Sequence, residues 1–75
     1  MKNECIIETG NGSGIKSFIF GGTYKLGKEK FARTTELPNE AKQYRNERAA
    51  IRVGKRLLKT CENIKWFSVQ NAEDH

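Results

Sequence analysis

One segment of this 75-residue chain, residues 38–61, is long and amphipathic enough to form a helix. At about 100° per residue, its apolar side chains fall in one broad arc. They are Tyr44, Ala50, Ile51, Gly54, Leu57, Leu58 and Cys61. Pro38 suits a first turn, because its φ is fixed near the helical value and its missing N–H is not needed there. We therefore predict one long helix over about residues 38–61.

Short β-branched and aromatic runs before this segment are typical of strands. Residues 5–8 (CIIE) form one such run, and residues 15–20 (IKSFIF) alternate with a period of two. The glycine-rich stretch between them, residues 10–14, suits a hairpin connection. Phe18 and Phe20 share one face of the alternating run, and we expect both in the core.

Glycine also marks the limits of the following strands. We expect Gly21 and Gly22 to end the second strand. Residues 23–26 (TYKL) and 30–34 (KFART) each have the composition of a strand, with Gly27 in the turn between them. The sequence leaves open whether these two runs form one bulged strand or two short strands.

A last aromatic and β-branched run, residues 64–70 (IKWFSVQ), follows the predicted helix. The polar residues 71–75 are expected to be a frayed tail. The element order is therefore β-β-(β)-β-α-β. We predict an α+β fold in which a small antiparallel sheet of three to four strands carries one long helix on one face, with the final strand beside an earlier one. Residues 1–75 would form a single domain.

A chain of this size buries only about 60% of its unfolded surface, so a homodimer is one way to enlarge its core. The two cysteines, Cys5 and Cys61, have no CxxC spacing, and no signal-peptide pattern follows Met1. We therefore expect a cytoplasmic protein with reduced thiols, although the sequence leaves a single Cys5–Cys61 bridge open. No apolar stretch is long enough for a transmembrane helix.

Charge is the most informative feature for function. Residues 38–61 hold seven basic and two acidic residues, whereas the rest of the chain holds seven of each, so the net charge of +5 falls on the predicted helix. Apart from the adjacent pair Lys55 and Arg56, successive basic residues are three or four positions apart on one flank, where like charges repel and lower helix stability. They are Lys42, Arg45, Arg48, Arg52, Lys55, Arg56 and Lys59.

Two explanations of this flank remain open: an ordinary solvated helix face, or a surface that binds an anion. If it binds an anion, we expect a non-enzymatic module that contacts the phosphate backbone of DNA or RNA, which gives affinity without sequence information. The alternative is an accessory protein or inhibitor that binds an acidic or nucleic-acid-binding surface of a host protein.

Patterns for catalysis or metal binding are weak. The glycines of residues 10–14 precede a strand rather than a helix, and no Lys-Ser/Thr pair follows them as a phosphate-binding loop requires. The only histidine, His75, is the last residue, and Cys5 and Cys61 are far apart in sequence. We expect no catalytic residue, no metal site and no cofactor; a small enzyme or metal protein is the third hypothesis.

Trp66 and Phe67 are adjacent in the last predicted strand and should point to opposite faces of it. One of them should therefore lie in the core. The other is either covered by the chain or exposed beside Lys65, where it could stack on a base or anchor a protein partner.

The stretch KFARTTELPNEAKQY resembles part of the integrase arm-binding domains and of plant-type DNA-binding domains. In those families a final strand is followed by a threonine-containing turn and a Glu-Ala-rich helix. The residues that match are Phe31, Thr34, Glu40, Ala41 and Tyr44. The resemblance implies a three-stranded sheet plus helix, with DNA read by the sheet face. The overall plan is also similar to small accessory proteins encoded by bacteriophages and mobile elements, several of which bind a host protein or its nucleic-acid channel.

Overall fold

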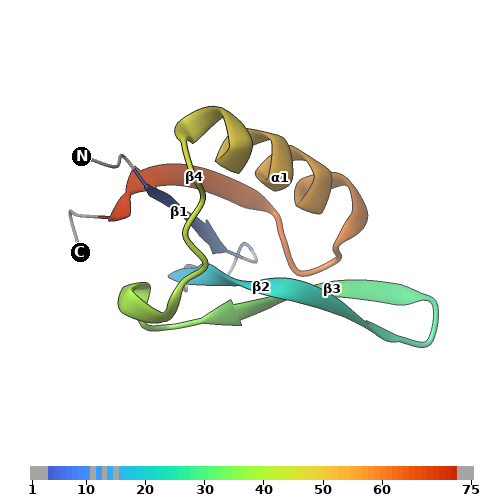
Figure 1. Cartoon of the computed structure of the whole chain (residues 1–75). Coiled ribbons are helices and arrows are strands. Elements are labelled where there is room, and N and C mark those ends of the chain that lie inside the picture. Colours follow the sequence, from blue (N-terminus) through green and yellow to red (C-terminus); the bar gives the residue numbers. More distant parts are fainter. Residues whose placement is uncertain (1–3, 11, 13, 15, 73–75) are drawn as a thin grey trace.

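The computed structural model describes residues 4–10, 12, 14 and 16–72. Its elements are β1 (Cys5–Gly10), β2 (Lys16–Leu26), β3 (Glu29–Thr35), the 3-10 turn η1 (Pro38–Glu40), α1 (Glu47–Thr60) and β4 (Trp66–Asn71). The four strands form one antiparallel sheet in the order β3-β2-β1-β4, and α1 lies across one face of it (Figure 1). The predicted α+β fold with the strand order β-β-β-α-β is confirmed.

The final strand returns beside an earlier strand, as expected, and that strand is the first. β4 pairs with β1 along the full length of both strands, from Cys5↔Asn71 to Gly10↔Trp66. Asn71, expected in the tail, is thus the last residue of a strand, and residues 73–75 lie outside the described residues. β1 and β2 are antiparallel, as the hairpin prediction requires, although residues 11, 13 and 15 of their connection also lie outside the described residues.

The glycine pair does not end the second strand, contrary to expectation. Gly21 and Gly22 have φ of 116° and 81°, and the β2–β3 register shifts between Ile19 and Thr23. Glycine adopts such positive φ angles without steric cost, so β2 bends here and continues to Leu26. Residues 23–26 therefore belong to β2, and residues 30–34 belong to β3. The second strand, predicted over residues 15–20, is therefore about twice as long in the structure, where it spans Lys16–Leu26.

The Phe20 side chain lies within the stretch where the register shifts. Phe18 is buried as predicted, but the Phe20 side chain is 50% exposed, so the prediction that both lie in the core is wrong for Phe20. The shift in register begins directly after Ile19, where the regular alternation of β2 is interrupted. Period-two alternation therefore could not place Phe20.

The predicted helix start at Pro38 is also wrong, because the backbone of residues 42–44 pairs with two strands. Lys42 N–H donates to the Ile19 carbonyl (2.9 Å), and Tyr44 exchanges two hydrogen bonds with Cys5 (2.7 and 3.0 Å). This segment thus fills the place where β1 and β2 diverge. The helix begins only after Asn46, whose side-chain Oδ1 accepts from the backbone N–H of Ala49 (2.8 Å).

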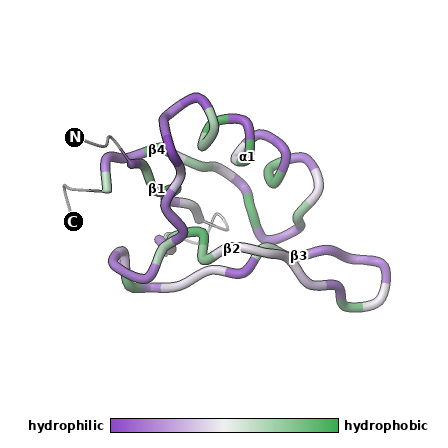
Figure 2. The backbone as a smooth tube through the Cα atoms, in the orientation of Figure 1, coloured by the Kyte–Doolittle hydropathy of each residue, from purple (hydrophilic) through white to green (hydrophobic). Residues whose placement is uncertain are grey.

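Two groups of buried side chains lie on opposite faces of the sheet. Figure 2 shows hydrophobic and hydrophilic residues alternating along α1, whose apolar side packs on the sheet. Ile6, Phe18 and Ala41 form a smaller cluster on the far face. The larger cluster, on the helix side, comprises Cys5, Ile7, Ile19, Ala32, Tyr44, Ala50, Leu57, Cys61 and Ile64.

The outer edge of β3 is covered by the loop between α1 and β4. The Asn63 side chain accepts a hydrogen bond from Ala32 N–H and donates one to the Ala32 carbonyl, each 3.0 Å long. Glu62 N–H donates to the Lys30 carbonyl (2.8 Å). This loop therefore satisfies backbone groups that an edge strand would otherwise leave unpaired.

Candidate functional site

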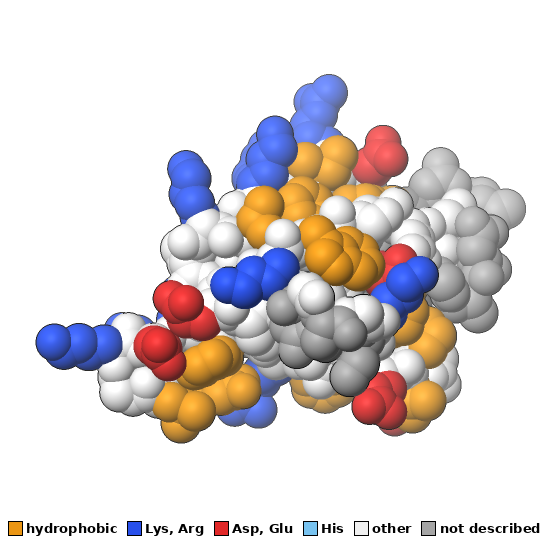
Figure 3. All heavy atoms as spheres, turned by 180° about the vertical axis from the view of Figure 1, so that it is seen from behind, with side chains coloured by type: hydrophobic (Ala, Val, Ile, Leu, Met, Phe, Trp, Pro, Cys, Tyr) orange, Lys and Arg blue, Asp and Glu red, His pale blue; other side chains and the backbone are white. Residues whose placement is uncertain are grey.

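The exposed side of α1 carries a row of basic residues, which we call the helix row. Its members lie within an arc of about 100°, opposite the buried residues Ala50, Gly54 and Leu57. The helix row comprises Arg48, Arg52, Lys55, Arg56 and Lys59, all exposed. Figure 3 shows basic side chains projecting over this part of the molecule. The single acidic residue of α1, Glu47, is in its first turn and outside this arc.

A groove beside α1 gathers three basic residues from three different segments. Lys30 comes from β3, Lys42 from the connection before α1, and Arg56 from α1 itself. The groove has a volume of about 240 Å³, and no acidic residue is among the described residues that line it. We call this the basic groove. Arg56 belongs to both the helix row and the basic groove, so the two form one continuous surface.

The backbone of each groove residue is fixed by a hydrogen bond. Lys42 is held by its N–H bond to Ile19, and its ammonium group lies 5.8 Å from the centre of the Tyr44 ring, within range of a cation–π contact. The carbonyl of Lys30 accepts from Glu62 (2.8 Å), and the carbonyl of Arg56 accepts from Thr60 Oγ1 (2.9 Å). The three positive charges are therefore presented from a fixed scaffold.

The β2–β3 hairpin adds a basic surface that the sequence analysis missed. Residues 16–35 hold five basic residues and one acidic residue, the same numbers as α1. The residues outside 38–61 have a net charge of zero, because acidic residues elsewhere in the chain balance the positive charge of the hairpin. The net charge alone therefore did not reveal the basic hairpin. Lys25 and Lys30 are direct partners in the β2–β3 ladder, where like charges repel. A two-residue turn at Gly27 and Lys28 would have predicted that pairing from sequence.

Two residues of the predicted flank are not on the helix. Lys42 and Arg45 both precede Asn46, the residue that caps α1. Lys42 nevertheless lies in the basic groove with Arg56. Arg45 is exposed in the connection and is not among the residues that line the groove. The structure therefore brings together six of the seven predicted basic residues and adds Lys30.

Trp66 and Phe67 point to opposite faces of the sheet, and each ring packs against a glycine: Trp66 against Gly10 of β1 and Phe67 against Gly54 of α1. A Cβ at Gly54 would be 2.4 Å from the Phe67 ring, and a Cβ at Gly10 would be 2.5 Å from Trp66 Nε1. Both aromatic side chains are half-buried. The more exposed aromatic residues are Phe20 and Tyr24, which the sequence analysis did not select.

The cysteines are placed for packing. Cys5 and Cys61 are both buried in the helix-side core. Burial, and to a lesser extent the nearby charge of Glu47, raises the pKa of the Cys5 thiol, which disfavours the nucleophilic thiolate. Burial likewise raises the pKa of Tyr44. Across residues 4–10, 12, 14 and 16–72, no group of three or more His, Cys, Asp or Glu could hold a metal ion. In the same part of the chain, no helix has the length and apolar character to cross a membrane.

Comparison with models of known protein families, with curated proteins and with solved structures gives no match to this chain. The resemblance to arm-binding and plant-type DNA-binding domains is therefore carried only by the short stretch from Phe31 to Tyr44. In that stretch Glu40 ends a 3-10 turn, and Tyr44 is in extended backbone, so the Glu-Ala-rich helix of those domains is not formed here.

Proposed function

We propose that this protein is a non-enzymatic module that binds nucleic acid through its phosphate backbone. One observation carries the proposal: Lys30, Lys42 and Arg56, from three separate segments, converge in one groove. Chance clustering of surface lysines along one helix would not bring in residues from β3 and from the preceding connection. The basic groove would hold one or two phosphates, and the helix row would extend the contact along the strand.

The energetics of the fold support this proposal. Like charges three or four positions apart on a helix, or directly opposite on two strands, each destabilise a fold by a few tenths of a kcal/mol. A bound polyanion removes this repulsion and releases counterions, which drives binding. Arg48, Arg52 and Arg56 are suited to forked contacts with phosphate oxygens. Such contacts position a nucleic acid without reading its sequence, so we expect little sequence preference from this surface.

A second candidate is an accessory protein or inhibitor that binds an acidic or nucleic-acid-binding surface of a host protein. The observation in its favour is Leu58, whose side chain is 42% exposed and lies with Lys55 and Lys59 on the outer side of α1. An apolar residue bordered by charged ones is typical of protein interfaces. The same helix row would then contact carboxylates instead of phosphates.

The proposal is tested by neutralising the basic groove without reversing its charge. We expect the triple variant Lys30→Gln, Lys42→Gln, Arg56→Gln to bind mixed DNA and RNA about tenfold or more weakly than the wild type in gel-shift experiments at low salt. Lys16→Gln, Arg45→Gln, Lys65→Gln is the matched control. It removes two lysines and one arginine from exposed positions outside the groove, and it should retain most of the affinity.

The two candidates are separated by capturing partners from native lysate with and without nuclease. A nucleic-acid module loses its captured material after nuclease treatment, whereas an inhibitor of a host protein retains a protein band. Absence of any shift by wild-type protein on DNA or RNA at low salt would falsify the nucleic-acid proposal.

A further inference from the structure

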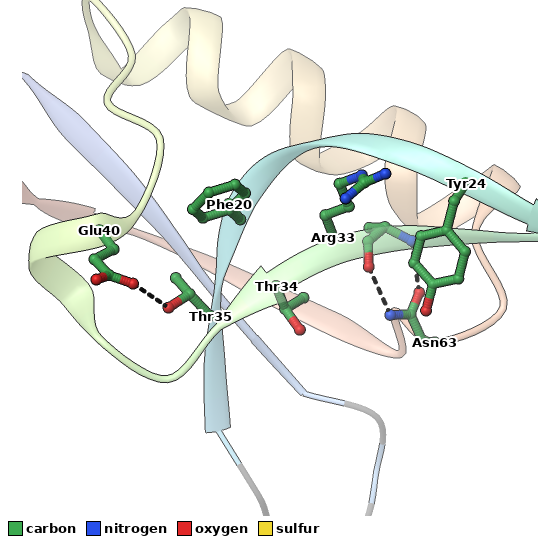
Figure 4. Close-up of a pocket in the computed structure, with 8 residues that line it drawn as sticks. Phe20, Tyr24, Arg33, Thr34, Thr35, Glu40 and Asn63 are labelled. Carbon is green, nitrogen blue, oxygen red and sulfur yellow. Dashed lines mark hydrogen bonds between the residues drawn. The ribbon is translucent and has the colours of Figure 1, made fainter.

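A second groove lies on the β2–β3 hairpin, and its lining differs in chemistry from that of the basic groove. It has a volume of about 470 Å³, within the range of sites that hold small organic groups. Two exposed aromatic residues border it, Phe20 (50% exposed) and Tyr24 (41% exposed). In Figure 4 these two rings stand on either side of Arg33. We call this the aromatic groove.

The Tyr24 ring is held in place by its neighbours on the hairpin. Tyr24 stacks on Phe31, its partner in the β2–β3 ladder, with ring centroids 5.5 Å apart and planes inclined by 24°. The Arg33 guanidinium carbon lies 5.8 Å from the Tyr24 centroid. A planar guanidinium beside fixed aromatic rings is a surface on which flat, polarisable groups stack. The groove therefore favours a planar ligand.

The polar residues of the aromatic groove suit the edge of a heterocycle better than a phosphate. Glu40 contributes a carboxylate, which would repel a phosphate but accepts hydrogen bonds from amino groups such as that of cytosine. Thr35 Oγ1 donates to Glu40 Oε1 (3.4 Å) and orients it, and the Thr34 hydroxyl lines the same groove (Figure 4). Asn63 is already engaged with the backbone of Ala32.

We infer that the aromatic groove binds an unpaired nucleobase, so that the preferred ligand of this protein is single-stranded nucleic acid. This inference rests on the proposed function and names its substrate class. Bases in a duplex are stacked on each other, and only an unpaired base can offer its face to Phe20 and Tyr24. Lys25 and Lys28, both exposed, would attract the adjoining backbone to the hairpin.

The test compares one sequence as a single strand and as a duplex, using a labelled oligonucleotide of about 15 nucleotides at moderate salt. We expect wild-type protein to bind the single strand about tenfold or more tightly than the duplex. The double variant Phe20→Leu, Tyr24→Leu removes both rings and retains apolar side chains at two partly exposed positions. It should lose this preference and keep the duplex affinity unchanged.

The matched control is Leu26→Ala, Leu37→Ala, which alters two exposed apolar residues outside the aromatic groove (62% and 51% exposed). It should leave single-strand binding unchanged. An equal loss in the control and in the Phe20/Tyr24 variant would overturn base stacking, because any apolar contact would then suffice.

The outcomes also separate this inference from the proposed function. If wild-type protein binds duplex and single strand equally, and the ring-removing variant matches it, base stacking is wrong and backbone binding stands. If neither nucleic acid binds, both proposals fail together. As an independent readout, a stacked base should shift the ring-proton resonances of Phe20 and Tyr24 upfield in NMR spectra. Unshifted ring resonances at saturating single strand would contradict the inference.

Discussion

Gly54 of α1 faces the ring of Phe67 across the interface between helix and sheet. A Cβ built at Gly54 would lie 2.4 and 2.5 Å from two carbons of that ring, closer than carbon atoms approach without repulsion. The absence of a side chain at this position therefore lets α1 lie directly on β4. Phe67 packs against the helix-side core, so the contact with Gly54 joins α1 to β4 beside that core.

The substitution Gly54→Ala tests this contact through the sign of its effect. In a solvent-exposed helix interior it would stabilise the protein by about 1 kcal/mol, because alanine has the higher helix propensity. Here we expect a destabilisation of about 1–3 kcal/mol, because the new methyl group overlaps the ring. Urea denaturation followed by circular dichroism measures the free energy of unfolding.

Phe67→Ala supplies the reference background for this measurement. In that background the ring is absent, and Gly54→Ala should become neutral or stabilising. Destabilisation of equal size in both backgrounds would show that the cost arises within α1 and not at the contact with β4.

Single residues also show what sequence reasoning could and could not find. Asn46, followed by an acidic residue and an apolar periodic run, is a recognisable helix start, but Pro38 offered a competing one. The choice between them depended on the backbone pairing of Tyr44 with Cys5, a contact between residues 39 positions apart. No local pattern encodes such a pairing.

At the scale of elements, the periodicity and composition of the sequence predicted where strands occur but did not predict their lengths. The alternation in residues 15–20 and the composition of residues 23–26 correctly indicated extended structure. The glycine pair between them acts as a bend rather than an end, because the strand beyond it gains a partner in β3. Helix and strand types were therefore predictable, and their limits were decided by tertiary pairing.

The edge of β3 gives a prediction at this scale. Asn63→Ala removes both hydrogen bonds to Ala32 and leaves two partly buried backbone groups without that partner. We expect a loss of about 1–3 kcal/mol in the free energy of unfolding, measured by urea denaturation. Asn63→Asp is the matched comparison.

The aspartate variant retains the acceptor for Ala32 N–H but loses the donor to the Ala32 carbonyl. Its free energy of unfolding should therefore be lower than that of the wild type, and its difference from the alanine variant measures what the remaining acceptor contributes. If both variants unfold at the same urea concentration as the wild type, the loop does not stabilise the edge of β3.

At the scale of the whole molecule, the excess positive charge lies on two elements, α1 and the β2–β3 hairpin, with the basic groove between them. The principal axes measure 42, 22 and 17 Å, so the molecule is elongated, and the hairpin extends beyond the helix (Figure 1). The basic residues of α1 were evident from the sequence, whereas the positions of Lys42 and Lys30 beside Arg56 were not. Their convergence depends on the bend in β2 and on the segment inserted between β1 and β2.

The most direct test of this account is the salt dependence of nucleic-acid affinity, measured for the wild type and for the basic-groove variant Lys30→Gln, Lys42→Gln, Arg56→Gln. Each phosphate contact adds about 0.7–0.9 to the slope of log affinity against log salt. We expect the variant to lose about one to two from this slope, because the basic groove would hold one or two phosphates, while the control Lys16→Gln, Arg45→Gln, Lys65→Gln retains the wild-type slope. Equal slopes for the groove variant and the wild type would contradict the account, because the converging residues would then contact no phosphate.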